Sequence, residues 1–188
     1  MRFLFLLACL FCCGSIIAGA QAVPTGSEGG GGDFAISYNW IHTNTQPGKC
    51  GCFAMTGATL SGSVHLTERW GAVLAAGTTF ASNGPGTGNS ITLGSVLGGA
   101  RYYLQSSYRF HPYAQVLVGV AHAGGGIAGA GDHSMALAGQ LGGGIDVPFG
   151  SALGLRLLEV DYYPTEFANG TNNKQNNFLV GGGAIYRW

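Results

Sequence analysis

Residues 177–188 (NFLVGGGAIYRW) decide the fold. Within them the side chains form two alternating sets, because apolar or small residues occupy every second position from Phe178 to Trp188. A period of two predicts a β-strand with two different faces. One face ends in Tyr186 and Trp188, and such rings are typical of the boundary between water and hydrocarbon. Because lipid cannot satisfy an open strand edge, this stretch predicts one strand of a closed barrel.

The composition of the whole chain is compatible with a barrel wall. Only 9% of the 188 residues are charged, against roughly 25% in soluble domains, and 35 residues are glycine. The net charge is zero and the few charges are dispersed, so we expect no nucleic-acid partner. A glycine-rich secreted structural protein would have a similar composition, so composition alone leaves both classes open.

The first residues have the pattern of a secretory signal peptide. Arg2 precedes the apolar segment 3–13, and Ala20-Gln21-Ala22 matches an A-x-A cleavage pattern. We therefore expect residues 1–22 to be removed and residues 23–32 (VPTGSEGGGG) to form a flexible lead-in to a barrel domain at 33–188. Two alternatives stay open, namely an uncleaved membrane helix at 3–20 and a lipoprotein signal ending at Cys9.

Seven further segments share the alternation of residues 177–188. Together they predict an all-β, eight-stranded, antiparallel up-and-down transmembrane barrel, with strands at 33–42, 55–66, 70–81, 90–104, 111–122, 135–147, 152–163 and 177–188. Long and short connections alternate between these strands, as in barrels with long extracellular loops and short periplasmic turns. Arg156 falls on the outward parity, which predicts a β-bulge or a side chain that reaches the rim.

Several stretches resemble small outer-membrane barrels of the OmpA/OmpX type. They are 184–188 (AIYRW), 99–103 (GARYY) and 112–115 (PYAQ), while 50–53 (CGCF) and 156–162 are similar to barrels predicted in Acidobacteria-like genomes. The resemblance covers about 33–188. It implies a monomer in the cell outer membrane, in contact with lipid and lipopolysaccharide, after delivery by periplasmic chaperones. It also implies that the barrel-assembly machinery recognises the terminal strand through Phe178, Val180, Tyr186 and Trp188.

Charged residues on the inward parity suggest a polar network inside the barrel. They are Arg101, Asp146, Glu159, Asp161 and Arg187, accompanied by His65, Gln115 and Gln140. The interior of an eight-stranded barrel is just wide enough for side chains to fill it. Unpaired charges there would cost several kcal/mol each, so we expect these groups to pair. A static plug is the favoured interpretation, and a rearranging gate for small ions is the alternative.

A lipid-modifying enzyme such as a lipid A deacylase is a further alternative. It would need a nucleophilic serine, a histidine base and an acidic partner within hydrogen-bond reach. His133 and Ser134 are adjacent and would face opposite sides of a strand, whereas Ser63 and His65 share a face at a loose spacing. We therefore expect no catalytic site and no cofactor.

Cys50 and Cys52 lie in the first long connection. An exported protein meets an oxidising compartment, which favours a local disulfide between them, although the two-residue separation makes the ring tight. Free thiols, an interchain bond, or a metal site recruiting His42 remain alternatives.

The sequence thus favours an integral outer-membrane barrel with a structural or surface-interaction role. A narrow gated pore and a lipid-modifying enzyme are the alternatives within the same fold. A soluble secreted β-sandwich is the alternative from another fold class, since a second protein layer could also cover the apolar faces.

Overall fold

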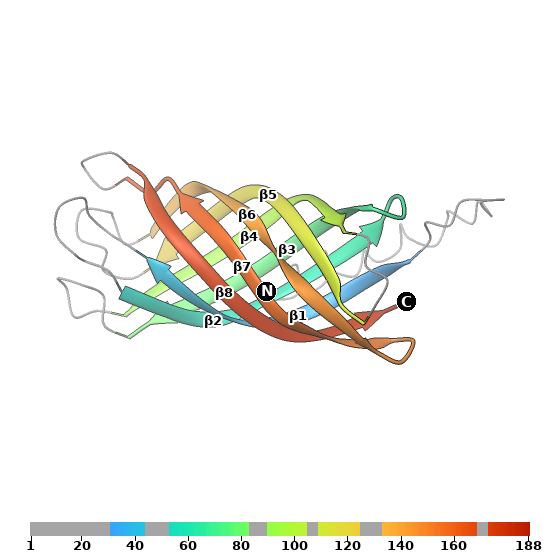
Figure 1. Ribbon diagram of the computed structural model, residues 1–188. Coiled ribbons are helices and arrows are strands. Elements are labelled where there is room, and N and C mark those ends of the chain that lie inside the picture. Colours follow the sequence, from blue (N-terminus) through green and yellow to red (C-terminus); the bar gives the residue numbers. More distant parts are fainter. Residues whose placement is uncertain (1–30, 44–52, 83–89, 105–108, 125–132, 169–172) are drawn as a thin grey trace, which may run out of the picture.

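The computed structural model describes residues 31–43, 53–82, 90–104, 109–124, 133–168 and 173–188. Eight antiparallel strands follow one another around a single closed barrel (Figure 1). They are β1 (Gly32–Thr43), β2 (Phe53–His65), β3 (Trp70–Ala81), β4 (Ile91–Tyr103), β5 (His111–Gly124), β6 (His133–Phe149), β7 (Leu153–Thr165) and β8 (Gln175–Arg187). The expected all-β, eight-stranded architecture is confirmed. In the described part of the chain, no helix has the length and apolar character required to cross a bilayer.

Pairing between β1 and β8 closes the barrel. The ladder runs from Asp33 opposite Arg187 to His42 opposite Phe178. Beyond it, Gly32 and Trp188 exchange both backbone hydrogen bonds, at 3.3 and 3.2 Å. The Trp188 ring then packs against Phe34 in a tilted arrangement, with 4.8 Å between ring centroids. The terminal strand identified in the sequence is therefore the one that completes the ring.

The outer wall of the barrel is apolar. Its side chains alternate with buried ones along each strand, and they include Val118 at 67% exposure and Leu74 at 63%. Aromatic pairs lie near the strand ends, for example Trp70 and Tyr102, whose ring centroids are 4.9 Å apart. A soluble protein rarely exposes such a large continuous apolar surface, whereas a membrane barrel presents it to lipid between aromatic girdles.

A β-bulge interrupts β7. Its registers with β6 and β8 both shift near Arg156, and Leu157 and Leu158 are exposed side by side at 49% and 43%. This extra residue turns Arg156 inward, where it is 2% exposed. The sequence predicted either a bulge at Arg156 or a side chain that reaches the rim. The structure has the bulge, and the second expectation is wrong.

The β6–β7 turn differs from the expected one. The expected strands at 135–147 and 152–163 leave a turn at 148–151, but Pro148 still pairs with Gly154, and β6 continues to Phe149. The chain reverses at Gly150, which has a φ of 73°, a conformation that glycine adopts without steric cost. Proline is tolerated at this position because it lies at the end of the strand, where few ladder hydrogen bonds are lost.

Candidate functional site

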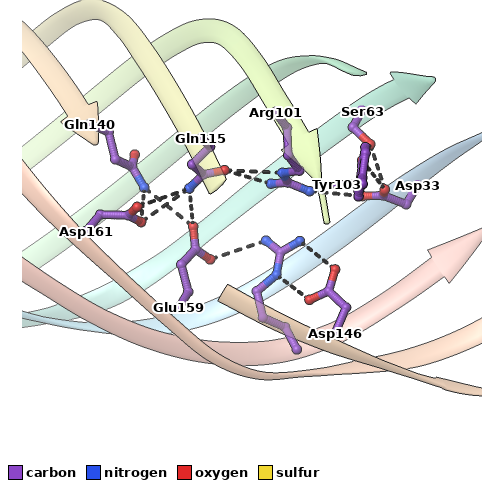
Figure 2. A network of polar contacts seen from close by, with 10 residues as sticks. Asp33, Ser63, Arg101, Tyr103, Gln115, Gln140, Asp146, Glu159 and Asp161 are labelled. Atoms are coloured by element: carbon purple, nitrogen blue, oxygen red, sulfur yellow. Dashed lines mark hydrogen bonds and ion pairs between the residues drawn. The ribbon is translucent and has the colours of Figure 1, made fainter. Parts of the chain in front are cut away.

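Buried polar side chains fill the half of the lumen nearest the short turns. They come from six strands and are joined by hydrogen bonds, by ion pairs and, for Tyr113, by contacts of its ring with two guanidinium groups; Figure 2 shows the hydrogen bonds and ion pairs. We call this set the lumen network: Asp33, Ser63, Arg101, Tyr103, Tyr113, Gln115, Gln140, Asp146, Arg156, Glu159 and Asp161. Because each member stands on the inward face of its strand, the network ties distant parts of the ring together.

Arg156 forms the closest ion pairs of the network. Its Nε and Nη2 donate to the two carboxylate oxygens of Asp146, at 3.0 and 3.3 Å, and its Nη1 donates to Glu159 Oε2 at 3.2 Å. All three side chains are buried. A two-point contact between guanidinium and carboxylate fixes orientation as well as charge, so Arg156 also holds the bulged part of β7 to β6.

Gln115 connects the arginine side of the network with its acidic side, as Figure 2 shows. Its Oε1 accepts hydrogen bonds from Arg101 Nε and Nη2, at 3.3 and 2.9 Å. Its Nε2 donates to Glu159 Oε1 at 2.8 Å and lies 3.2 Å from Asp161 Oδ2. The Nε2 of Gln140 donates to the same Asp161 oxygen at 2.6 Å. Two amides therefore hold the two carboxyl groups of β7.

The Tyr113 ring lies within reach of both buried guanidinium groups. Arg101 Cζ is 4.2 Å and Arg156 Cζ is 4.9 Å from the ring centroid. Such contacts stabilise a buried cation through the negative face of the ring. Tyr113 thus supports two like charges that would otherwise repel each other across the lumen.

Asp33 anchors the network to the first strand. Its Oδ2 accepts hydrogen bonds from Ser63 Oγ at 2.6 Å and from the Tyr103 hydroxyl at 3.3 Å. Its Oδ1 lies 3.7 Å from Arg101 Nη1, which is an ion pair beyond hydrogen-bond distance. Arg101 therefore has a close amide partner and a more distant carboxylate.

The structure brings together four of the five charged residues that the sequence suggested, namely Arg101, Asp146, Glu159 and Asp161. Arg187 lies apart from these four residues. It is only half-buried at the end of β8, beside Gly154, and no ion pair of its side chain is found among the described residues. Its parity is inward, but it stands where the lumen meets solvent, so charge pairing is not required there.

Arg156 and Asp33 are members that the sequence analysis missed. The bulge concealed Arg156, because simple alternation puts it outside. Asp33 could have been found, since it shares the inward parity of Ser37 and Asn39 at the start of the same strand. His65, expected beside the network, stacks on Tyr103 with 4.7 Å between ring centroids, and its Nδ1 contacts the Gly31 carbonyl oxygen at 3.0 Å.

Apolar side chains fill the half of the lumen nearest the long connections. This apolar layer includes Ile41, Met55, Ile91, Leu93 and Phe167. A small polar group lies beside it, where Asn177 accepts a hydrogen bond from Thr43 and donates one to the Tyr163 carbonyl at 2.9 Å. Two voids near the middle leave about 10 and 20 Å³ for the centres of water molecules. Each has room for one water molecule or little more.

The enzymatic candidates lack a shared geometry. Ser63 Oγ contacts Asp33 and Tyr103, while His65 Nδ1 contacts a backbone carbonyl. The side chains of His133 and Ser134 lie outside the described set, as do Cys50 and Cys52. Within the described residues, no group of three or more His, Cys, Asp or Glu side chains is arranged to hold a metal ion.

Several solved structures have the same architecture as this barrel. Neisserial surface protein A matches with a TM-score of 0.64 at 12% identity, over 84% of this chain and 98% of that one. Ail, the attachment invasion locus protein of Yersinia pestis, matches with a TM-score of 0.54 at 15% identity, over 85% of this chain and 99% of that one. OprG from Pseudomonas aeruginosa matches with a TM-score of 0.51 at 16% identity, over 87% of this chain and 98% of that one. This is the fold of the small outer-membrane barrels. No protein-family model matches the chain, and no curated protein sequence does.

This outer-membrane barrel has a definite polarity along its axis. In the fold, the short turns face the periplasm and the long connections face outward. The lumen network therefore occupies the periplasmic half of the interior, and the apolar layer occupies the outer half. The protein is an integral outer-membrane protein whose apolar wall contacts the bilayer.

Proposed function

We propose that this barrel is a sealed outer-membrane scaffold with a structural or surface-interaction role. The observation that supports it is the packing of the lumen, where a polar and an apolar layer follow each other along the axis. Among the described residues, the two voids between these layers have room for about one water molecule each, which is too little for a continuous aqueous path through this part of the lumen.

The ion pairs of Arg156 argue against a pore. A path for ions past Asp146 and Glu159 would require their contacts with Arg156 to separate inside a buried environment. Removing one partner of a buried ion pair typically costs about 3–5 kcal/mol. A spontaneous opening would therefore be rare, and we assign these contacts to a static plug.

The surface role is supported by where the long connections emerge. All four leave the barrel at the end opposite the short turns, and connecting segments on a rigid scaffold commonly carry recognition. Among the structural neighbours, Ail is described as an attachment invasion locus protein, so one protein of this fold has such a role. We extend this as a proposal to the present chain.

The proposed partners follow from the outer wall and the terminal strand. The wall would contact outer-membrane lipid and lipopolysaccharide, and the protein would act as a monomer. Phe178, Val180, Tyr186 and Trp188 all point outward from β8 and are exposed or partly exposed. They would be available to the barrel-assembly machinery and to periplasmic chaperones before the barrel enters lipid.

Planar bilayer recordings test the sealed lumen. The wild-type barrel is expected to give no stepwise conductance above the bare bilayer. A variant with Arg156, Asp146 and Glu159 all replaced by alanine tests what these ion pairs contribute, and it should also give no conductance because the apolar layer remains in place. Discrete channel openings from the folded wild-type protein would overturn the sealed-scaffold proposal.

Cells that carry barrels with shortened connections separate the structural role from the surface role. Replacing 44–52, 83–89, 125–132 and 169–172 by tight turns is expected to abolish attachment of the cells to immobilised polysaccharide or protein. If the barrel wall alone carries the structural role, cells with the shortened barrel should resist detergent as well as cells with the wild-type barrel do. If neither property differs between cells with the wild-type barrel, the shortened barrel and no barrel, both roles are wrong.

A further inference from the structure

The buried charges of the lumen do not balance. The described lumen residues that are at least nine-tenths buried include four carboxyl groups (Asp33, Asp146, Glu159 and Asp161) and two guanidinium groups (Arg101 and Arg156). Four negative charges against two positive ones leave an excess of two. Buried ionised groups without a counter-charge are strongly disfavoured, and protonation is the usual way in which a protein relieves them.

Asp161 is the carboxyl group with the poorest compensation. Asp146 and Glu159 both contact Arg156, and Asp33 lies 3.7 Å from Arg101. Asp161 is 0% exposed, and no ion pair of its side chain is found within the described part of the chain. Its contacts are the neutral amides of Gln140, at 2.6 Å, and Gln115, at 3.2 Å.

The same two amides bridge Asp161 and Glu159. Gln115 Nε2 lies 2.8 Å from Glu159 Oε1 and 3.2 Å from Asp161 Oδ2. Gln140 Nε2 lies 3.4 Å from the first oxygen and 2.6 Å from the second. The two residues are also two positions apart on the inward face of β7, so their side chains point the same way. We propose that Glu159 and Asp161 form a buried proton-binding site, in which the two carboxyl groups share one proton at neutral pH.

A proton fits this site better than a metal ion does. Gln115 has its Oε1 directed at Arg101, so its Nε2 hydrogens are the atoms that face the carboxyl pair. A metal ion needs oxygen ligands at these positions and would meet amide hydrogens instead. The adjoining void has room for about one water molecule and also borders the Arg101 guanidinium, which repels cations.

The groups around the pair offer no other compensation. The other buried titratable or charged side chains of the lumen are Asp33 on β1, Arg101 on β4, Tyr113 on β5, Asp146 on β6, and Arg156 and Tyr163 on β7, with the half-buried Tyr103 on β4. On β8 the buried positions in this region are Leu179 and Ile185, which carry no charge. His65, on β2, is occupied by Tyr103 and the Gly31 carbonyl oxygen. Protonating the pair would remove one of the two excess charges.

A shared proton links the stability of the barrel to pH. Exposed carboxyl groups of the unfolded chain release their protons near pH 4, whereas the folded pair would keep one. The unfolded state then binds fewer protons, so stability falls as the pH rises. The equilibrium constant for unfolding should increase by up to about tenfold per pH unit, until the folded pair itself releases the proton.

Infrared spectroscopy of the full-length chain, folded in detergent micelles, tests the proposal directly. Exposed carboxyl groups are ionised at pH 7, so a carbonyl stretch of a protonated carboxylic acid must come from a buried one. We expect this band in the wild-type protein and its loss in Asp161→Asn, where Glu159 remains with Arg156. Glu68→Gln, at an exposed turn, is the matched control and should keep the band.

Urea unfolding between pH 5 and pH 9 provides the second readout. The wild-type barrel should lose stability as the pH rises, and Asp161→Asn should show a flatter profile. The absence of a protonated-acid band in the folded wild-type protein at pH 7 would overturn the proposal, whether or not the variant folds. A band that persists unchanged in folded Asp161→Asn would also overturn it.

Discussion

Arg156 shows how a single side chain can depend on a local irregularity of the backbone. Regular alternation along β7 would direct it into lipid, where an arginine at mid-membrane costs about 2–4 kcal/mol. The bulge places it inside instead, in contact with Asp146, Glu159 and the Tyr113 ring. A polar side chain that would oppose membrane insertion thereby becomes the centre of the plug.

The first prediction concerns the guanidinium geometry of Arg156. Arg156→Lys keeps the charge but cannot donate to both oxygens of Asp146 and to Glu159 in the same planar arrangement. We expect it to lower the free energy of unfolding by about 1–3 kcal/mol, because hydrogen-bonding groups lose partners in a buried site. Urea unfolding in lipid vesicles, followed by tryptophan fluorescence, measures this change. Arg109→Lys, at an exposed position, should have no effect, and equal effects of both substitutions would contradict the assignment.

The second prediction concerns Asp161. Replacing it with alanine removes the acceptor for two buried amides, those of Gln115 and Gln140. Leaving buried donors without a partner costs about 1–3 kcal/mol, so Asp161→Ala should unfold at a lower temperature than the wild type. On a denaturing gel, a folded barrel and the same barrel unfolded by heat migrate as different bands (heat modifiability). The temperature at which the folded band converts to the unfolded band measures this change. Unchanged conversion would mean that the contacts of Asp161 do not support the fold.

Sequence alternation was sufficient to suggest Arg101, Asp146, Glu159 and Asp161 as lumen residues, because parity alone fixes the face of a strand. It could not show which partners they have, since pairing depends on register between strands that are distant in sequence. The position of Arg187 also lay beyond it, because parity does not tell how deep a residue lies. The disulfide between Cys50 and Cys52 stays a prediction.

At the level of the strands, glycines allow neighbouring backbones to approach closely. A Cβ atom at Gly183 would lie 1.9 Å from the Ile36 carbonyl oxygen on β1. This distance is too short for any side chain at position 183. Comparable positions occur at Gly99 against Val116 on β5. These glycines permit the strong coiling of strands that a narrow barrel needs.

The third prediction follows from this contrast between glycines. Gly183→Ala should prevent β8 from pairing with β1 in the native register. Most molecules should therefore fail to reach the folded, heat-modifiable form. Gly98→Ala is the matched control, since a Cβ there would meet its nearest atom, the Val73 carbonyl oxygen, at 3.6 Å. The folded fraction after refolding into detergent measures both. Efficient folding of Gly183→Ala would show that the seam tolerates a wider separation of strands.

The bounds of most strands could be predicted because alternation ends where glycine, proline and asparagine gather. The expected strand at 70–81 is the observed β3. β6 was two residues longer at each end than expected, at 133–149 instead of 135–147. Proline and glycine both signal turns, and only the backbone conformation at Gly150 shows which of them reverses the chain.

At the level of the whole molecule, the apolar wall decides where the protein resides. The fourth prediction is that Val118→Arg, near the middle of β5, lowers stability by about 2–4 kcal/mol in a bilayer. Phe149→Arg, at the end of β6 near the interface, should cost only about 0–1 kcal/mol. Unfolding titrations in vesicles compare the two. Equal costs would mean that these two positions do not differ in membrane depth.

The closed architecture as a whole could be predicted from the sequence, because eight alternating segments with apolar outer faces leave few other ways to satisfy the backbone. The division of the lumen into a polar and an apolar half was not evident. It arises from the antiparallel order, in which the end of one strand lies beside the start of the next. Residues such as Ile41 and Met55 are separate in the sequence and become neighbours only through this pairing.

The bulge in β7 makes that strand two short segments of opposite phase. Before it, even-numbered residues such as Gly154 and Arg156 face the interior, and after it odd-numbered residues such as Glu159 and Asp161 do. Removing one of the two adjacent leucines would merge the segments into a single regular strand in which these inward residues still face inward, whereas straightening the bulge with both leucines kept would exchange inside for outside along one segment. If this strand were grafted onto a barrel without a bulge, the inward positions before the bulge would have to be numbered from one end of the strand and those after it from the other end.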